Sequence, residues 1–199
     1  MATDPFAPPP RENNSVSPRN LAFLRDNEEA FKLLDQVRWI GHAKCPRCGS
    51  MFTKEVNTSV FRELTRCLDC SYMFNQLSGT MFQGSKIPLV KFYQLFIVYD
   101  ASEEKISSRE VSYVIDVSDK TAQSLLSRLR KVGTYESFTT TDQSYPLEEN
   151  GDHAEADTKH GAFFLYCGMK SISVDVDAFK TFLALIVNIK PDPPGLRSH

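Results

Sequence analysis

The sequence has no long hydrophobic run, and this excludes a membrane-spanning helix. The longest candidate extends from Phe182 to Ile189, whereas a span needs roughly 20 consecutive apolar residues. With 41% hydrophobic residues, 24% charged residues and 14 Phe, the composition is that of an ordinary soluble globular protein. At 199 residues, the chain can hold one medium domain or two small ones.

The chain also lacks a strong excess of charge of either sign. Its net charge is −2, and this balance does not by itself indicate binding to nucleic acid. The charge is unevenly distributed, since residues 45–133 carry 12 basic and 9 acidic residues, while residues 134–199 carry 5 and 10. The middle of the chain is therefore mildly basic and its C-terminal part acidic.

Cysteine is scarce, yet four of the five cysteines form two Cys-x-x-Cys pairs with 18 residues between them. This spacing fits a tetrahedral zinc site, because a pair on a tight turn can direct two sulfurs at one ion about 2.3 Å away. Pro46 fixes φ after the first sulfur, and Gly49 lets the chain turn back. A disulfide pair is the alternative, but the proline-rich N-terminus shows no secretory signal. The expected ligands of a structural Zn²⁺ are Cys45, Cys48, Cys67 and Cys70.

Two further residues, His42 and Cys167, are potential metal ligands, but neither is needed to complete the four-cysteine site. His42 lies three residues before the first cysteine, but four thiolates already fill a tetrahedral site. Cys167 is the odd cysteine, and we expect it to be a plain buried thiol.

The residues around the cysteine pairs predict a small antiparallel sheet. Residues 52–56 and 60–65 partly alternate and are rich in β-branched and aromatic side chains, residues 57–59 can form a turn, and residues 72–75 predict a third strand. Two cysteine turns and three strands make a zinc ribbon over residues 45–80. A unit this small should depend on its metal, which contributes on the order of 10 kcal/mol in structural zinc sites.

The segments before the ribbon differ in composition. Residues 1–20 are rich in Pro, Asn and Ser and are expected to be disordered. Residues 21–44 contain an amphipathic lead-in helix, with Asp26 as N-cap and an end near Trp39.

Residues 81–133 predict a helix-turn-helix. One helix begins at Pro88, and two more, at residues 107–115 and 119–131, are separated by a short turn. In a helix-turn-helix the second helix lies in the major groove of DNA, and an ordinary helical bundle with a solvated face is the alternative.

The second of these two helices supplies the candidate DNA contacts. Lys120, Gln123 and Ser124 would face base edges, and basic residues further along would contact phosphates. The complete candidate set is Lys120, Thr121, Gln123, Ser124, Ser127, Arg128, Arg130 and Lys131.

The remainder of the chain divides into an acidic linker, residues 134–153, and a β-rich fragment, residues 154–199. Within this fragment, residues 161–167 and 172–176 predict strands, and residues 182–189 fit a strand or a helix equally well.

These motifs, in this order, resemble the N-terminal region of zinc-ribbon insertion-sequence transposases and the related Merlin elements of eukaryotes. The resemblance covers roughly residues 24–133, and one departure is Asp116, where the family has glycine and where Asp tolerates a positive φ. The matching residues are Arg38-Trp39, Cys45–Gly49, Cys67–Cys70, Gly79-Thr80-Met81-Phe82, Phe92, Ile106-Ser107, Lys120-Thr121-Ala122, Leu126 and Arg130.

The resemblance implies a following DDE-type, ribonuclease-H-like catalytic domain in which acidic residues bind two divalent ions such as Mg²⁺. Asp157 is the candidate for the first carboxylate, with a solvated linker acid as the alternative, and Asp175 and Asp177 do not align with the second. Only 66 residues follow Gly133, against about 100–150 for a complete domain. We therefore expect a truncated catalytic remnant.

The predicted fold class is α+β: a zinc ribbon with a three-stranded antiparallel sheet, a helix-turn-helix bundle and a short β-rich fragment of a ribonuclease-H-like domain. The predicted function is zinc-dependent recognition of transposon-end duplex DNA, without catalysis by this chain alone. Its expected partners are duplex DNA and either a second copy of itself or a full-length transposase, with no membrane. The expected localisation is intracellular, in the nucleus of a eukaryote or the cytoplasm of a bacterium. The alternatives are a Mg²⁺-dependent transposase completed by partner chains and a zinc-ribbon module for protein interaction.

Overall fold

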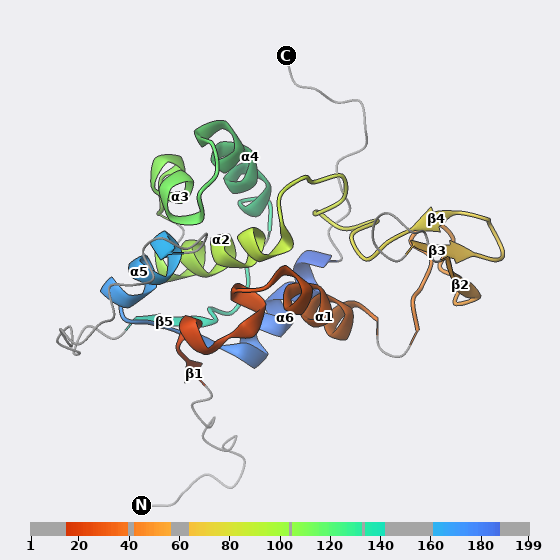
Figure 1. Ribbon diagram of the computed structural model, residues 1–199, viewed down its shortest axis with the longest axis horizontal. Helices are drawn as coiled ribbons and strands as arrows, with labels where there is room; N and C mark the ends of the chain where they lie inside the picture. Colours follow the sequence, from red (N-terminus) through yellow and green to blue (C-terminus); the bar gives the residue numbers. More distant parts are fainter. Residues whose placement is uncertain are drawn as a thin grey trace, which may run out of the picture.

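The computed structural model describes residues 15–39, 42–56, 64–103, 105–132, 134–141 and 161–187. These residues form a ribbon, residues 42–56 and 64–80, and a helical body that contains the remaining elements (Figure 1). The mixture of helices and small antiparallel sheets confirms the α+β class. In chain order the elements are β1 (Ser15–Val16), η1 (Pro18–Asn20), η2 (Ala22–Leu24), α1 (Asn27–Arg38), β2 (Thr53–Val56), β3 (Leu64–Cys67), β4 (Met73–Phe74), α2 (Leu89–Ala101), α3 (Ser108–Ile115), α4 (Asp119–Leu129), β5 (Thr139–Thr141), α5 (Gly161–Met169), β6 (Ile172–Asp175) and α6 (Val176–Val187).

The predicted lead-in helix is α1. The side chain of Asp26 accepts a hydrogen bond from the backbone N–H of Glu28 at 2.9 Å, and this satisfies one of the donors left open at the helix start. Ala30, Leu33 and Leu34 are buried at helical spacing. Their burial fixes α1 against the helical body.

The ribbon contains the predicted three-stranded antiparallel sheet, in the order β2-β3-β4. Thr53 pairs with Cys67, and Thr65 pairs with Phe74. The expected turn at residues 57–59 and the first part of the strand expected at 60–65 lie outside the described residues. In the described part, the second strand is β3 and continues as far as Cys67.

Helix α2 is the centre of the helical body. Every residue from Leu89 to Asp100 is buried, including the polar side chains of Lys91, Gln94 and Asp100. Two side chains of α2 donate to the N-terminal segment: Gln94 to the carbonyl of Leu24 at 3.0 Å and Tyr93 to the carbonyl of Ala30 at 3.0 Å. In Figure 1, α3 and α4 lie on one side of α2, and α1 and α6 lie on the other.

Helices α3 and α4 form at the predicted places and are joined by a tight turn. Ser107 and Glu110 form a reciprocal capping box at the start of α3, and the Ser118 side chain caps α4. Asp116 occupies the left-handed region with φ of 53°, as expected for the residue that replaces glycine. The hydroxyl of Ser112 donates to the carbonyl of Val117 at 2.7 Å and holds the turn against α3.

A second three-stranded sheet, in the order β1-β6-β5, corrects two expectations. Residues 15–20 were expected to be disordered, but they form β1 and η1, with Pro18 buried. Residues 139–141 were expected to be linker, but they form β5, because the Asp100 carboxylate gathers the backbone N–H groups of Phe138 and Thr139 at 3.0 and 2.8 Å. The rest of the expected disordered segment and of the linker lies outside the described residues.

The strand expected at residues 161–167 is wrong, because this segment belongs to helix α5. Phe163, Phe164 and Cys167 are buried at helical spacing, and their packing overrides the β-propensity of the aromatic residues. The strand expected at 172–176 is confirmed as β6, and for 182–189 the helical alternative is correct as far as Val187. The described C-terminal fragment is therefore mostly helical around one strand, and the expected β-rich character is wrong.

One hydrophobic core joins η2, α1, α2, α3, α4, α5, β6 and α6. Its centre is aromatic: the ring centroid of Phe182 lies 5.4 Å from that of Phe96 and 4.7 Å from that of Phe138. The lead-in helix, the α3–α4 pair and the C-terminal fragment thus pack together, whereas the ribbon has its own small cluster of Cys45, Cys67 and Phe74. Within the described ranges, no helix has the length and apolarity to cross a bilayer.

Candidate metal centre and nucleic-acid interface

The structure brings the four predicted ligand cysteines together at one end of the ribbon. All four sulfurs lie within 4.8 Å of one another. Cys45 Sγ is 3.6 Å from Cys70 Sγ, and Cys48 Sγ is 3.6 Å from Cys67 Sγ. A tetrahedron with metal–sulfur bonds of about 2.3 Å has sulfur–sulfur edges of about 3.8 Å. The donor set therefore fits a structural Zn²⁺ with no open position for a substrate.

Each cysteine pair lies on a turn that is closed by a backbone hydrogen bond. In the first, the N–H of Gly49 donates to the carbonyl of Cys45 at 2.9 Å, and Gly49 has φ of 76°. In the second, the N–H of Cys67 donates to the carbonyl of Tyr72 at 2.9 Å, and Ser71 takes the matching left-handed conformation with φ of 57°. The sequence predicted the role of Gly49 but gave no comparable signal for Ser71.

Backbone N–H groups donate hydrogen bonds to cysteine sulfurs of the cluster, and these hydrogen bonds favour the thiolate form. The N–H of Cys70, helped by that of Asp69, donates to the Cys67 sulfur and lowers the Cys67 pKa to about 7. The N–H of Ser50 acts in the same direction on Cys48, but the neighbouring thiols and burial outweigh it, and the pKa of Cys48 is raised. The thiolate is the form that binds metal. A bound Zn²⁺ would hold all four cysteines in this form.

Arg38 connects the ribbon to the helical body. Its guanidinium donates to the backbone carbonyls of Gln76 and Ser78, in the segment that follows β4. It also lies over the ring of Trp39, 4.8 Å from the centroid. Burial lowers the Arg38 pKa to about 10, so the side chain is still charged at neutral pH.

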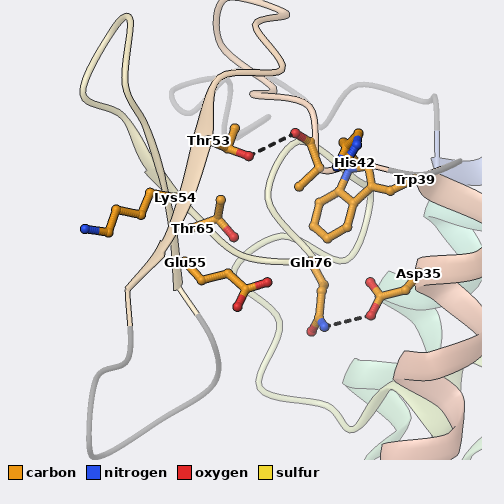
Figure 2. Close-up of a pocket in the computed structure, with 9 residues that line it drawn as sticks. Asp35, Trp39, His42, Thr53, Lys54, Glu55, Thr65 and Gln76 are labelled. Carbon is orange, nitrogen blue, oxygen red and sulfur yellow. Dashed lines mark hydrogen bonds between the residues drawn. The ribbon is translucent and has the colours of Figure 1, made fainter.

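A cleft of about 630 Å³ lies between the end of α1 and the ribbon sheet (Figure 2). The Asp35 and Glu55 side chains approach it from opposite walls, and Gln76 donates to Asp35 at 2.9 Å (Figure 2). His42 lines this cleft, and the sulfur cluster consists of the four cysteines alone. His42 is therefore not among the residues that the structure brings to the metal centre.

The candidate DNA-contact residues lie on and just after α4. Seven of the eight are exposed, and Thr121 is half-buried, with its hydroxyl 2.8 Å from that of Ser118. Arg128 also reaches the carbonyl of Met81 at 3.5 Å, which ties it to the connector after the ribbon. The opposite face of α4 packs into the core through Ala122, Leu125, Leu126 and Leu129.

Comparison with protein families identifies the region around the metal centre. The family model described as a transposase zinc-ribbon domain matches residues 25–73. This range contains all four cysteines of the cluster. Residues 25–73 are thus similar to a transposase zinc-ribbon domain. The resemblance to zinc-ribbon insertion-sequence transposases is thereby confirmed.

A protein of the archaeon Halobacterium salinarum, described as an uncharacterized protein in transposable element ISH50, shares similarity beyond the transposase zinc-ribbon domain. It is 27% identical to this chain over 143 residues, which are 71% of this chain and 42% of the relative. The chain thus spans less than half of that relative's length. No solved structure shows a significant match.

The segment Gly79–Phe82 leads from the ribbon into the helical body. A Cβ on Gly79 would lie 2.8 Å from the Cβ of Pro46, so only glycine lets the connector lie this close to the first cysteine turn. Thr80 is fully buried, and its hydroxyl donates to the carbonyl of Leu77 at 2.6 Å. Phe82 is part of the core, and its ring centroid lies 4.9 Å from that of Phe92. These residues have a structural role that sequence reasoning recognised only as part of the resemblance.

The candidate catalytic residue Asp157 lies outside the described residues. Asp175, which could not be aligned to a catalytic acid, caps α6 by accepting hydrogen bonds from the N–H groups of Asp177 and Ala178 at 3.0 Å each. Among the described residues, the four cysteines are the group of metal-binding side chains that the structure assembles.

Proposed function

We propose that this chain is a zinc-dependent protein of transposase descent that binds duplex DNA of the transposon-end type through α4. The observation that carries the proposal is the two-sided character of α4. One face is anchored in the core by apolar residues, and the other presents Lys120, Gln123 and Ser124 to solvent. A helix held in this way can enter the major groove without rearrangement.

The supporting helix α3 also fits this function. The Asp116 turn and the hydrogen bond from Ser112 to the carbonyl of Val117 join α3 to α4, and α3 is backed by α2 and α5. In the proposed complex, Lys120, Gln123 and Ser124 read base edges. Arg128, Arg130 and Lys131 hold phosphates near the end of α4.

The transposase zinc-ribbon domain is attached close to the same helix. The connector that follows it contains Met81, whose carbonyl accepts from Arg128. Whether the ribbon is folded therefore influences the position of the Arg128 side chain. For this reason the proposed DNA binding depends on zinc.

The test is binding of the zinc-loaded full chain to a fluorescently labelled, mixed-sequence duplex, followed by anisotropy over a salt series. Three phosphate contacts predict a slope of log affinity against log salt of about −3. The variant Lys120→Ala should weaken binding, whereas Lys180→Gln, on α6 across the body from α4 (Figure 1), should not. Absence of duplex binding at low salt by a folded, zinc-loaded chain would leave the protein-interaction alternative.

Catalysis requires a separate test. Strand transfer with Mg²⁺ would need a carboxylate such as Asp157 and partner chains that complete the site. Mg²⁺-dependent cleavage of DNA that is lost in Asp157→Asn, while duplex binding is retained, would support that alternative.

A further inference from the structure

The ribbon sheet has two faces of different character. Side chains alternate along a strand, so Thr53 and Glu55 on β2 face one side and Lys54 faces the other. Figure 2 shows this directly: Glu55 and Thr65 point towards the cleft, and Lys54 points away from it. We call the side that carries Lys54 the outer ribbon face.

The strand register defines the residues of the outer ribbon face. Lys54 pairs with Arg66, which in turn pairs with Met73. Two residue pairs further along, just beyond the ends of β2 and β3, the N–H of Leu68 donates to the carbonyl of Phe52 at 2.8 Å. The face therefore comprises Phe52, Lys54, Arg66, Leu68 and Met73.

This face is both apolar and basic. Phe52 is 70% exposed, Leu68 59% and Met73 41%, in a unit whose own buried cluster is very small. Lys54 and Arg66 are exposed, and none of the described carboxylates lies within ion-pair distance of either. Like charges directly opposite each other on neighbouring strands destabilise a sheet. A bound anion would remove that repulsion.

The side chains of the outer ribbon face indicate which kind of anion fits this surface. An acidic peptide would bind in a groove or add a strand at a sheet edge, whereas these side chains project from the surface of all three strands. Duplex DNA offers its phosphates but keeps the faces of its bases stacked inside. An unpaired strand offers both phosphates and base faces, and exposed aromatic side chains beside cations are the usual platform for it.

We propose that the outer ribbon face binds single-stranded DNA. Phe52 stacks on an unpaired base, Lys54 and Arg66 hold the flanking phosphates, and Leu68 and Met73 pack against the neighbouring base and sugar. This surface is separate from α4, as Figure 1 shows with the ribbon and α4 in different parts of the molecule. The inference goes beyond the proposed duplex binding and does not depend on it.

The experiment uses the zinc-loaded full chain and a fluorescently labelled oligothymidylate of about 20 nucleotides, a length that exceeds one typical binding site. Phe52→Ser should weaken single-strand binding by about 5- to 150-fold, the range for loss of one stacked base. Phe52→Tyr retains the ring and should bind like the wild type. The double variant Lys54→Gln/Arg66→Gln should also lose affinity, and Lys180→Gln serves as the matched charge control.

Two readouts make the result decisive. Zinc content and the far-ultraviolet circular dichroism spectrum should be unchanged in all variants, because the substituted side chains are exposed. Duplex binding should respond to Lys120→Ala and single-strand binding should not, so failure of either proposal is seen separately. The inference is overturned if the wild type does not bind the oligonucleotide, if the Phe52→Ser and double variants bind it equally well, or if polyglutamate displaces it more effectively than unlabelled oligothymidylate.

Discussion

The guanidinium of Arg38 stacks on the ring of Trp39 while it donates hydrogen bonds to the segment after β4. One side chain thus fixes the end of α1, the aromatic wall of the cleft and the exit of the ribbon. Trp39 is the one tryptophan of the chain. Its fluorescence therefore reports on the junction between the ribbon and the helical body.

We expect Arg38→Ala to lower the free energy of unfolding by about 1.5–3 kcal/mol, the range for hydrogen bonds made by a charged group. Arg38→Lys should recover part of this loss, because an ammonium group keeps the charge but not the planar fork. The measurement is urea denaturation followed by Trp39 fluorescence. Lys32→Ala, on the exposed side of the same helix, is the control and should change stability by less than about 0.5 kcal/mol. Equal stability of Arg38→Ala and the wild type would show that the junction does not depend on this contact.

Removal of zinc should affect the ribbon and the helical body differently. The ribbon has little core of its own, so chelation should unfold it and shift the emission of Trp39. The helical body has a large shared core and should keep most of its far-ultraviolet circular dichroism signal. Cys48→Ser should abolish stoichiometric zinc binding, and Cys167→Ser should not. Full zinc content in Cys48→Ser would contradict the four-cysteine site.

Cys167 should be unreactive in the folded protein. Burial raises the pKa of its thiol to about 12, so little thiolate forms at pH 8. Its contribution to stability is complete below the unfolded-state pKa of about 8.5 and is lost as the pH rises towards 12. We expect slow alkylation of Cys167 at pH 8 in the zinc-loaded protein, measured by mass spectrometry of the labelled peptide, and fast alkylation in denaturant. Equally fast labelling in both states would mean that α5 does not stay packed.

Asp100 should be essential for the second sheet. One of its carboxylate oxygens accepts from the hydroxyls of Ser137 and Thr139 at 2.9 and 2.7 Å, as well as from the backbone that leads into β5. Asp100→Ala leaves these donors without their acceptor and should cost about 1–3 kcal/mol or more in the free energy of unfolding. Hydrogen exchange should show faster exchange in β5 and unchanged protection in the ribbon. Asp177→Asn, an exposed carboxylate on α6, is the control.

Substitution of Arg130 tests whether the basic residues at the end of α4 contact phosphates. Arg130→Ala should weaken binding to all duplex sequences alike and reduce the salt slope by about 1. Gln123→Ala, in contrast, should leave the slope unchanged and reduce discrimination between sequences. A salt slope that is unaffected by Arg130→Ala would remove this residue from the interface.

The sequence predicted the features that depend on local chemistry. The spacing of the cysteines was sufficient to predict the metal centre, because the required turn involves only neighbouring residues. Capping side chains such as Asp26, Ser107 and Ser118 fixed where α1, α3 and α4 begin. The left-handed conformation of Asp116 was expected from the resemblance, because the family has glycine at this position.

The tertiary structure decided the features that depend on distant partners. Residues 161–167 have the composition of a strand, yet they are helical because Phe163, Phe164 and Cys167 meet the core at helical spacing. Residues 15–16 and 139–141 are strands because β6 pairs with both, and Asp100 holds the start of β5 in place. In the same way, Lys54 and Arg66 form one surface through strand register alone. The local sequence does not specify such partners, because the hydrogen bonds and packing contacts between distant segments form only when the chain has folded.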